Sequence, residues 1–180
     1  MKVITAPEEY VKQSKDICVF LAGGITNCRN WQKEVIQWLN DNTYKCDNEH
    51  LVIFNPRREN FPIHDKNAAY EQIEWEFRML EHCDIFSMYF CNADSDQPIC
   101  MYELGRNIVR IQNRFPSTWL KRIIVTVEEG YKREKDVLVQ TNLAMEGRIN
   151  NVNICFNKND SITHHSNCIN SLFKKLRDSE

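Results

Sequence analysis

Short apolar runs alternate along the chain with longer stretches in which apolar residues recur every three or four positions. Short runs closed by glycine, proline or polar residues are typical of buried strands. They cover residues 17–22, 51–56, 84–90, 122–127 and 152–156. The longer stretches have the periodicity of amphipathic helices and cover residues 31–40, 67–83, 99–113, 134–145 and 161–177. The pattern therefore predicts five strands, each followed by a helix.

This alternation predicts an α/β fold. Strands that alternate with helices favour βαβ units, and continuously apolar strands belong to a parallel sheet with helices on both faces. The chain has 180 residues and no internal repeat or linker, so we expect a single domain over residues 1–180. Ligands of such sheets bind beyond the carboxyl ends of the strands. That rule selects the loops at 22–30, 55–66, 90–100 and 127–134.

Composition excludes several classes of function. A net charge of −2 and a pI near 6.2 lack the basic excess of a protein that binds a nucleic-acid polymer. No apolar run is long enough to span a membrane and no signal-peptide core is present, so we expect a cytoplasmic protein. The eight cysteines contain no CxxC pair and the five histidines no HxxxH, which predicts no metal site. His164 and His165 are expected to be solvated turn residues.

Two of the selected loops contain residues suited to binding. "AGGI" follows the first predicted strand. Gly23 and Gly24 allow a ligand to approach the backbone, although on this pattern alone a tight strand-to-helix turn is the favoured interpretation. "NPRR" follows the second strand. Arg57 and Arg58 suit phosphate or carboxylate, but adjacent arginines are also common on protein surfaces.

The helix predicted at 67–83 contains an acidic residue on its apolar side. The residues expected to face the core are Tyr70, Ile73, Phe77, Leu80 and Cys83. Glu76 falls between Ile73 and Leu80 on this side. A carboxylate moved toward the interior costs desolvation unless it has a partner, which makes it a candidate for a functional site. The alternative is a glutamate at the edge of the apolar side whose carboxylate reaches water.

Glu103 is a second candidate, on the helix predicted at 99–113. It falls on the polar side of that helix, and amphipathicity alone therefore favours a solvated residue. Its expected place in the first turn favours function, since a helix N-terminus lowers the pKa of a carboxyl group. Pro98 suits the first helical position and Asp96 the cap. Enzymes that break glycosidic bonds usually use two carboxyl groups, and an ionised carboxylate with a partly buried one would form such a pair.

Five motifs occur in order over most of the chain. They are "VFLAGGIT" (19–26), "VIFNPRR" (52–58), "IEWEFRMLEHCDIFSMYF" (73–90), "PICMYELGR" (98–106) and "EEGYKREKDVLVQTNLA" (128–144). Together they resemble the nucleoside 2-deoxyribosyltransferase family, in its deoxyribosyltransferase-like branch. The resemblance implies a flavodoxin-like three-layer sandwich with a five-stranded parallel sheet, no cofactor, and a homo-oligomer.

The resemblance also implies roles for particular residues. Glu103 of "MYELG" matches the nucleophile that forms a covalent deoxyribosyl–enzyme intermediate. Glu76 stands where the family usually has an aspartate that contacts the nucleobase and helps to protonate it. The residues expected to bind substrate are Gly23, Gly24, Ile25, Trp31, Asn55, Arg57, Arg58, Asp96 and Tyr102. Two departures are visible: the first strand lacks the tyrosine that orients the nucleophile in related enzymes, and Gln97 replaces a second acid.

We therefore expect an enzyme that cleaves or transfers the N-glycosidic bond of a 2′-deoxynucleoside, with a second base or water as acceptor. Two alternatives stay open. One is an N-glycosidase of deoxynucleoside monophosphates, with Arg57 or Arg58 at the phosphate. The other is a non-catalytic nucleotide sensor on the same fold, because fold alone does not fix function. In each case the partner is a small nucleoside or nucleotide.

Overall fold

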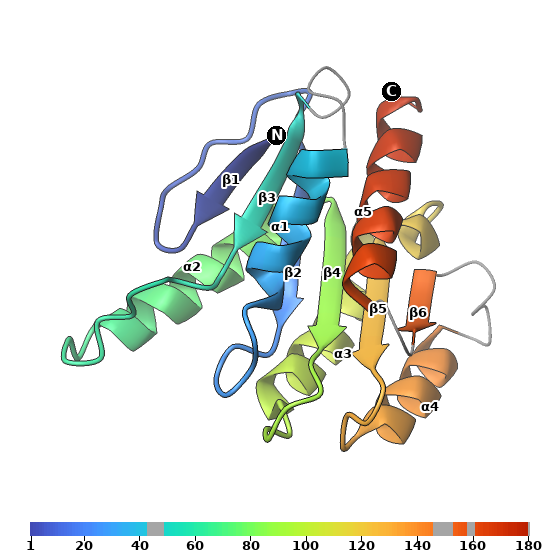
Figure 1. Ribbon diagram of the computed structural model, residues 1–180. Coiled ribbons are helices and arrows are strands. Elements are labelled where there is room, and N and C mark those ends of the chain that lie inside the picture. Colours follow the sequence, from blue (N-terminus) through green and yellow to red (C-terminus); the bar gives the residue numbers. More distant parts are fainter. Residues whose placement is uncertain (43–48, 146–152, 158–160, 180) are drawn as a thin grey trace.

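Six parallel strands form one sheet in the computed structural model, which describes residues 1–42, 49–145, 153–157 and 161–179. The strands are β1 (Lys2–Thr5), β2 (Ile17–Gly23), β3 (Leu51–Asn55), β4 (Ile85–Phe90), β5 (Ile123–Glu128) and β6 (Asn153–Asn157). Their order across the sheet is β1-β3-β2-β4-β5-β6, and their carboxyl ends point to the lower edge in Figure 1. The five predicted strands are confirmed as β2 to β6. β1 is an additional edge strand that the pattern did not predict.

Helices cover both faces of the sheet. They are α1 (Trp31–Asn42), α2 (Ala68–His82), α3 (Pro98–Arg114), α4 (Glu134–Ala144) and α5 (Ser161–Arg177), with a 3-10 turn, η1 (Trp119–Lys121). α1 and α5 pack on one face and share one core cluster, while α2, α3 and α4 contribute to the cluster on the other face. α1 and α5 lie in front of the sheet in Figure 1. The predicted flavodoxin-like three-layer sandwich is confirmed.

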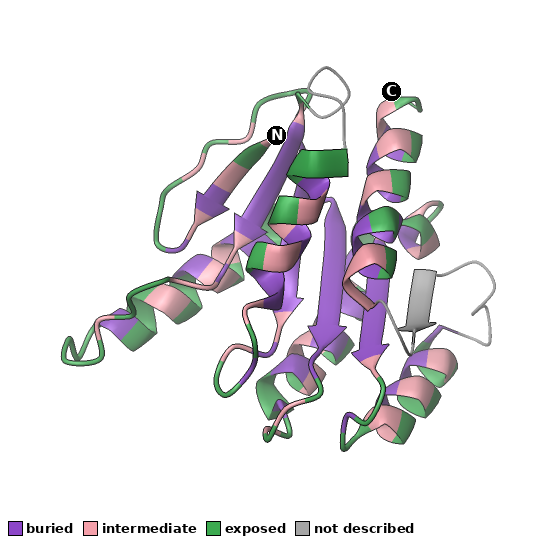
Figure 2. Ribbon diagram, viewed as in Figure 1, coloured by how far each residue is buried: buried purple, intermediate pink, exposed green. Residues whose placement is uncertain are grey.

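The strands β2 to β5 are buried because each of them supplies residues to both core clusters. In β2, Phe20 and Ala22 face α2 and α3, whereas Val19 and Leu21 face α1 and α5. Successive side chains of a strand point to opposite faces of the sheet. Because helices cover both faces here, every residue of the strand is apolar. The central strands are accordingly buried along their length in Figure 2.

The face that α2 presents to the sheet differs from the predicted one. Leu80 and Cys83 are buried as expected, but Tyr70, Ile73 and Phe77 are exposed. The helix packs instead through residues that include Trp75, whose indole N–H also donates to the Glu8 carbonyl oxygen at 2.7 Å. The large indole therefore sets the rotation of α2, which turns the predicted apolar side partly outward.

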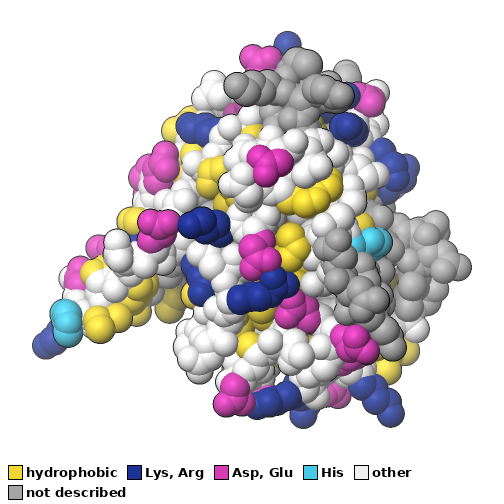
Figure 3. Space-filling model, in the orientation of Figure 1, with side chains coloured by type: hydrophobic (Ala, Val, Ile, Leu, Met, Phe, Trp, Pro, Cys, Tyr) yellow, Lys and Arg dark blue, Asp and Glu magenta, His cyan; other side chains and the backbone are white. Residues whose placement is uncertain are grey.

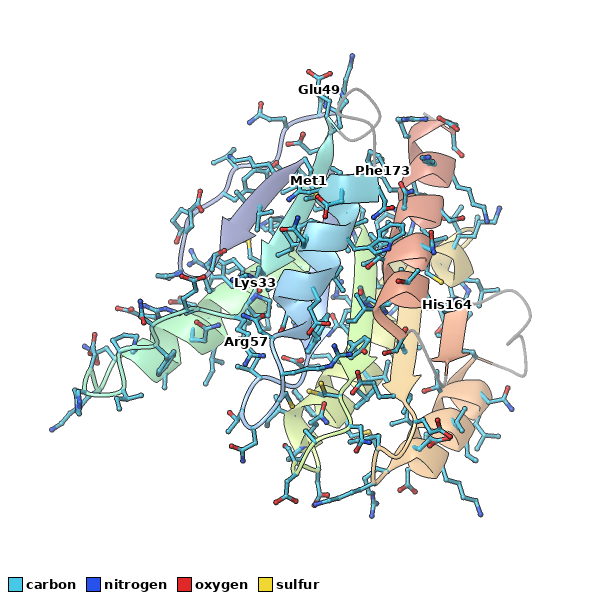
Figure 4. The ribbon with its side chains drawn as sticks, in the orientation of Figure 1. Met1, Lys33, Glu49, Arg57, His164 and Phe173 are labelled. Carbon is cyan, nitrogen blue, oxygen red and sulfur yellow. The ribbon has the colours of Figure 1, made fainter. Side chains whose placement is uncertain are left out.

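His165 is wholly buried, so the prediction that it is solvated is wrong. Its two ring nitrogens lie 2.6 Å from Ser87 Oγ and 2.6 Å from Thr126 Oγ1, on adjacent strands. Burial lowers the pKa of His165 to about 3, and the ring is therefore neutral. His164 is exposed, as expected, but it lies on α5 and not in a turn (Figure 4). The hydroxyl groups of Ser87 and Thr126 satisfy both ring nitrogens, which explains why a histidine is tolerated between α5 and the sheet.

The chain reverses its direction across the sheet between β2 and β4. It runs from β2 outward to β3 and then returns past β2 to form β4. The loops after these three strands therefore meet at one edge, which is the topological switch point where ligands of open α/β sheets bind.

Candidate active site

A cavity of about 240 Å³ lies at this switch point, between the loops that follow β2 and β4 and the helices α2 and α3. Both predicted carboxylates and the glycine turn line it. The residues around it are Phe20, Ala22, Gly23, Gly24, Ile25, Thr26, Pro56, Glu76, Ser95, Gln97, Pro98, Ile99, Cys100 and Glu103. The wall is thus mainly apolar, with two acids and a few neutral polar groups.

Glu76 of α2 and Glu103 of α3 face each other closely enough to interact electrostatically. Burial, and then the neighbouring charge of Glu76, raise the pKa of Glu103 to about 7. Burial also raises the pKa of Glu76, against the effect of the Gln72 amide, which donates to Glu76 Oε1 at 2.8 Å. Two carboxyl groups with raised pKa values favour a state with a single proton between them near neutral pH.

The prediction of a lowered pKa for Glu103 is wrong. α3 begins at Pro98, which confirms proline at the start of the helix but places Glu103 in the second turn. The stabilising effect of a helix N-terminus falls off within the first turn, so burial and Glu76 prevail. The cap residue is Gln97, not Asp96. Asp96 is exposed, and its carbonyl oxygen accepts a hydrogen bond from the Tyr131 hydroxyl at 2.7 Å.

The glycine turn is required by close packing beneath the cavity. A Cβ atom on Gly23 would lie 2.6 Å from Cζ2 of Trp31, and one on Gly24 would lie 2.5 Å from Gln97 Oε1. Trp31 is fully buried, stacks on Tyr89 with ring centroids 4.7 Å apart, and donates its indole N–H to the Gly24 carbonyl oxygen at 2.9 Å. Trp31 therefore supports the turn from below and does not line the cavity.

Arg57 holds the loop after β2 in place. Its guanidinium donates to the carbonyl oxygens of Arg29 at 2.7 Å and Cys28 at 2.9 Å. Asn55 Oδ1 in turn accepts the Arg57 backbone N–H at 3.0 Å. Figure 4 shows Arg57 beyond the carboxyl end of β3, beside this loop. The two residues shape the surroundings of the cavity without lining it.

Two more of the predicted substrate-binding residues lie away from the cavity. The Arg58 guanidinium stands over the Phe61 ring, 5.4 Å from its centroid. Tyr102 is exposed on α3. The structure thus brings Gly23, Gly24 and Ile25 to the two glutamates. The predicted residues that it leaves outside the cavity lining are Trp31, Asn55, Arg57, Arg58, Asp96 and Tyr102.

Gln97 is a site residue whose role the sequence did not reveal. Only 4% of it is exposed, and its backbone is left-handed, with φ of 47°. Its amide donates to the Cys91 carbonyl oxygen at 2.7 Å and accepts from the Cys91 N–H at 3.3 Å. Gln97 thus joins the loop after β4 to the glycine turn and fixes the start of α3. The sequence signals for Gln97 were its position directly before Pro98 and its replacement of a second acid of the family.

Other kinds of site receive no support from the described parts of the chain. Among residues 1–42, 49–145, 153–157 and 161–179, no cluster of three or more His, Cys, Asp or Glu side chains suits a metal ion. No helix in those ranges has the length and hydropathy needed to cross a membrane.

The protein is a flavodoxin-like α/β protein with a small cavity at the switch point of its sheet. Two interacting carboxyl groups line this cavity. Residues 16–115 match the sequence model of the family described as "Nucleoside 2-deoxyribosyltransferase like". The match covers more than half of the chain and includes both glutamates, so the chain belongs to this family. A comparison with curated proteins gives no significant match.

Proposed function

We propose that the protein is an enzyme that cleaves or transfers the N-glycosidic bond of 2′-deoxynucleosides. The observation that carries the proposal is the meeting of Glu76 and Glu103, from separate helices, in one cavity. Family membership supports the same reaction class.

Each glutamate has a distinct task in the proposed reaction. The Glu103 carboxylate attacks C1′, a C1′–O bond forms, and the C1′–N bond to the base breaks. The proton held by the pair lies on Glu76 in the reactive form and passes to the departing base. A second base or water then attacks C1′ and displaces Glu103, and the Glu76 carboxylate takes the proton that this acceptor loses. The two inversions give net retention. The raised pKa values keep one proton available near neutral pH. Because the pKa of Glu103 is about 7, the reactive form is the one in which this proton has moved from Glu103 to Glu76.

The size and lining of the cavity support a single nucleoside as substrate. Its volume of about 240 Å³ lies at the small end for ligand sites. Phe20, Pro56 and Ile99 give it apolar walls suited to a base or a deoxyribose ring. A polymer would not fit such a space.

The charge around the cavity favours nucleosides over their monophosphates. Among the described residues that line it, none has a basic side chain. Arg57, the predicted phosphate ligand, donates to backbone carbonyl groups instead. A 5′-phosphate would have to rely on Ser95 and the backbone amides at the start of α3.

The test is base release from 2′-deoxynucleosides and their monophosphates, with and without a second base. We expect Glu103→Gln to lower kcat by about 10³-fold or more, because removal of a nucleophile costs several kcal/mol of transition-state stabilisation. The matched control is Glu8→Gln, since Glu8 is exposed. An unchanged kcat in Glu103→Gln would refute the mechanism. Binding detected as a ligand-dependent rise in Tm, with no base release, would instead identify the non-catalytic sensor.

A further inference from the structure

Gln72 of α2 forms two hydrogen bonds through one nitrogen atom. Its side-chain amide donates to the Pro56 carbonyl oxygen at 2.6 Å and to Glu76 Oε1 at 2.8 Å. Residues four positions apart lie on one side of a helix, which brings Gln72 to Glu76. The described residues that line the cavity include Pro56 and Glu76 but not Gln72. Gln72 therefore joins the acid to the cavity wall without itself reaching the cavity.

The Pro56 carbonyl group fixes the orientation of the Gln72 amide. A carbonyl oxygen can only accept a hydrogen bond, so the N–H₂ end of the amide must face it, whatever the protonation state of Glu76. The amide oxygen, Gln72 Oε1, is accordingly buried and has no hydrogen-bond partner among the described residues. The same N–H₂ group is thereby directed at Glu76 Oε1 as a donor.

This contact determines which oxygen of Glu76 carries the proton. Oε1 accepts the amide N–H, and in a neutral carboxyl group the carbonyl oxygen is the better acceptor, so the hydroxyl group is at Oε2. Oε2 forms no hydrogen bond with any residue that the structure describes. Oε2 is therefore the oxygen that is available to a ligand in the cavity.

The other ionisable groups near Glu76 do not take over this contact. In the described lining of the cavity they are Glu103 and Cys100, both on α3, and the lining residues from β2 and from the loops after β2, β3 and β4 are uncharged. Burial raises the pKa of Cys100 to about 12, so its thiol is neutral near pH 7. Arg106 acts on Glu103 and is ion-paired with Glu81.

We propose that Gln72 is a positioning residue that holds Glu76 with its protonated oxygen, Oε2, directed at the departing base. This inference rests on the proposed function. As the base leaves, the Oε2–H bond breaks, the proton passes to a nitrogen atom of the base, and the negative charge spreads over both oxygens of Glu76. The hydrogen bond to Oε1 strengthens as that charge forms, so it stabilises the transition state more than the ground state. Oε2 takes up a proton again when the acceptor attacks.

The pKa of Glu76 tests the contact without any measurement of activity. It is measured by NMR on protein with ¹³C-labelled glutamate carboxyl groups, in the Glu103→Gln background, so that Glu76 titrates without its charged neighbour. Gln72→Met keeps the length of the side chain but cannot donate, and should raise this pKa by about one pH unit or more. Gln72→Glu adds a like charge and should raise it further. An unchanged pKa in Gln72→Met would overturn the proposal, and Gln72→Glu decides in the same way if Gln72→Met does not fold.

Gln37→Met is the matched control. Gln37 donates to both carboxylate oxygens of Asp41 at 2.9 Å, with the same spacing along α1. Both residues are exposed, and α1 covers the other face of the sheet; Figure 3 shows this side of the molecule, where acidic and basic side chains lie together on the surface. Gln37→Met removes an equivalent hydrogen bond and should leave the pKa of Glu76 and base release unchanged.

The pH dependence of base release tests the role of Gln72 in the reaction. Gln72→Met should lower kcat by about tenfold or more and leave KM nearly unchanged, because Gln72 acts through Glu76 and does not line the described cavity. The decline of kcat at high pH should move to a higher pH, since Glu76 then retains its proton longer. A lower kcat with the high-pH decline in its original place would show that Gln72 supports only the structure and would overturn its role.

Failure of this inference and failure of the proposed function give different results. If the wild-type protein releases base and Gln72→Met changes neither the pKa of Glu76 nor the pH dependence of kcat, the inference about Gln72 alone is wrong. If the wild-type protein releases no base from any 2′-deoxynucleoside, the proposed function is wrong, and the role of Gln72 in the reaction is wrong with it.

Discussion

At the scale of single residues, the site is defined by the cost of burying Glu103. Its pKa rises from 4.5 to about 7 because burial and the charge of Glu76 disfavour the ionised form. A carboxyl group whose pKa is higher in the folded state than in the unfolded state binds its proton more tightly when folded. This favours the folded state below about pH 4.5, and the advantage is lost as the pH rises to 7.

Replacement of Glu103 by glutamine should therefore stabilise the protein in a pH-dependent way. Glutamine cannot ionise, so Glu103→Gln should raise the free energy of unfolding by on the order of 3 kcal/mol at pH 8 and have little effect at pH 4.5. Thermal unfolding at the two pH values measures the difference, with Glu8→Gln as the control. A variant that is less stable than the wild type at pH 8 would show that the ionised carboxylate has a stabilising partner.

At the scale of elements, the glycine turn and α3 allow a direct comparison of two glycines. A Cβ on Gly24 would lie 2.5 Å from Gln97 Oε1 and 2.5 Å from Cys28 Sγ, whereas a Cβ on Gly105 meets nothing within 4 Å. Gly24→Ala should cost about 1–3 kcal/mol of stability through overpacking. Gly105→Ala should instead stabilise α3 by about 0.5–1 kcal/mol, because alanine favours the helix.

Chemical denaturation of the two variants measures these effects. Gly24→Ala should also lower base release, since the turn lines the cavity, while Gly105→Ala should leave it unchanged. Equal stability of Gly24→Ala and the wild type would contradict the tight packing of the turn.

The type of each element could be predicted from sequence more reliably than its rotation. The apolar runs of β2 to β5 are continuous because both faces of these strands are covered, and the pattern therefore predicts them. The rotation of α2 was not, because Trp75 anchors that helix and leaves Ile73 and Phe77 outside. β1 was missed because its four residues, with one buried, carry little pattern.

At the scale of the whole molecule, the order of the strands brings the site together. Glu76 and Glu103 lie 27 positions apart in sequence, on the helices that follow β3 and β4. The switch point places those helices on the same side of β2, so both acids reach one cavity. Sequence motifs identified the two acids. The hydrogen bonds of Gln97 to the Cys91 backbone and of Arg57 to the carbonyl oxygens of Cys28 and Arg29 were not predicted, because they depend on how the loops fold and not on a local sequence pattern.

The most direct test of the account is a search for the covalent intermediate. The protein is mixed with a 2′-deoxynucleoside, denatured rapidly in acid, digested and examined by mass spectrometry. We predict a mass increase of one deoxyribosyl group on the peptide that contains Glu103, and its absence in Glu103→Gln. Base release by the wild-type protein with the sugar attached to a different residue would contradict the assignment of Glu103 as the nucleophile.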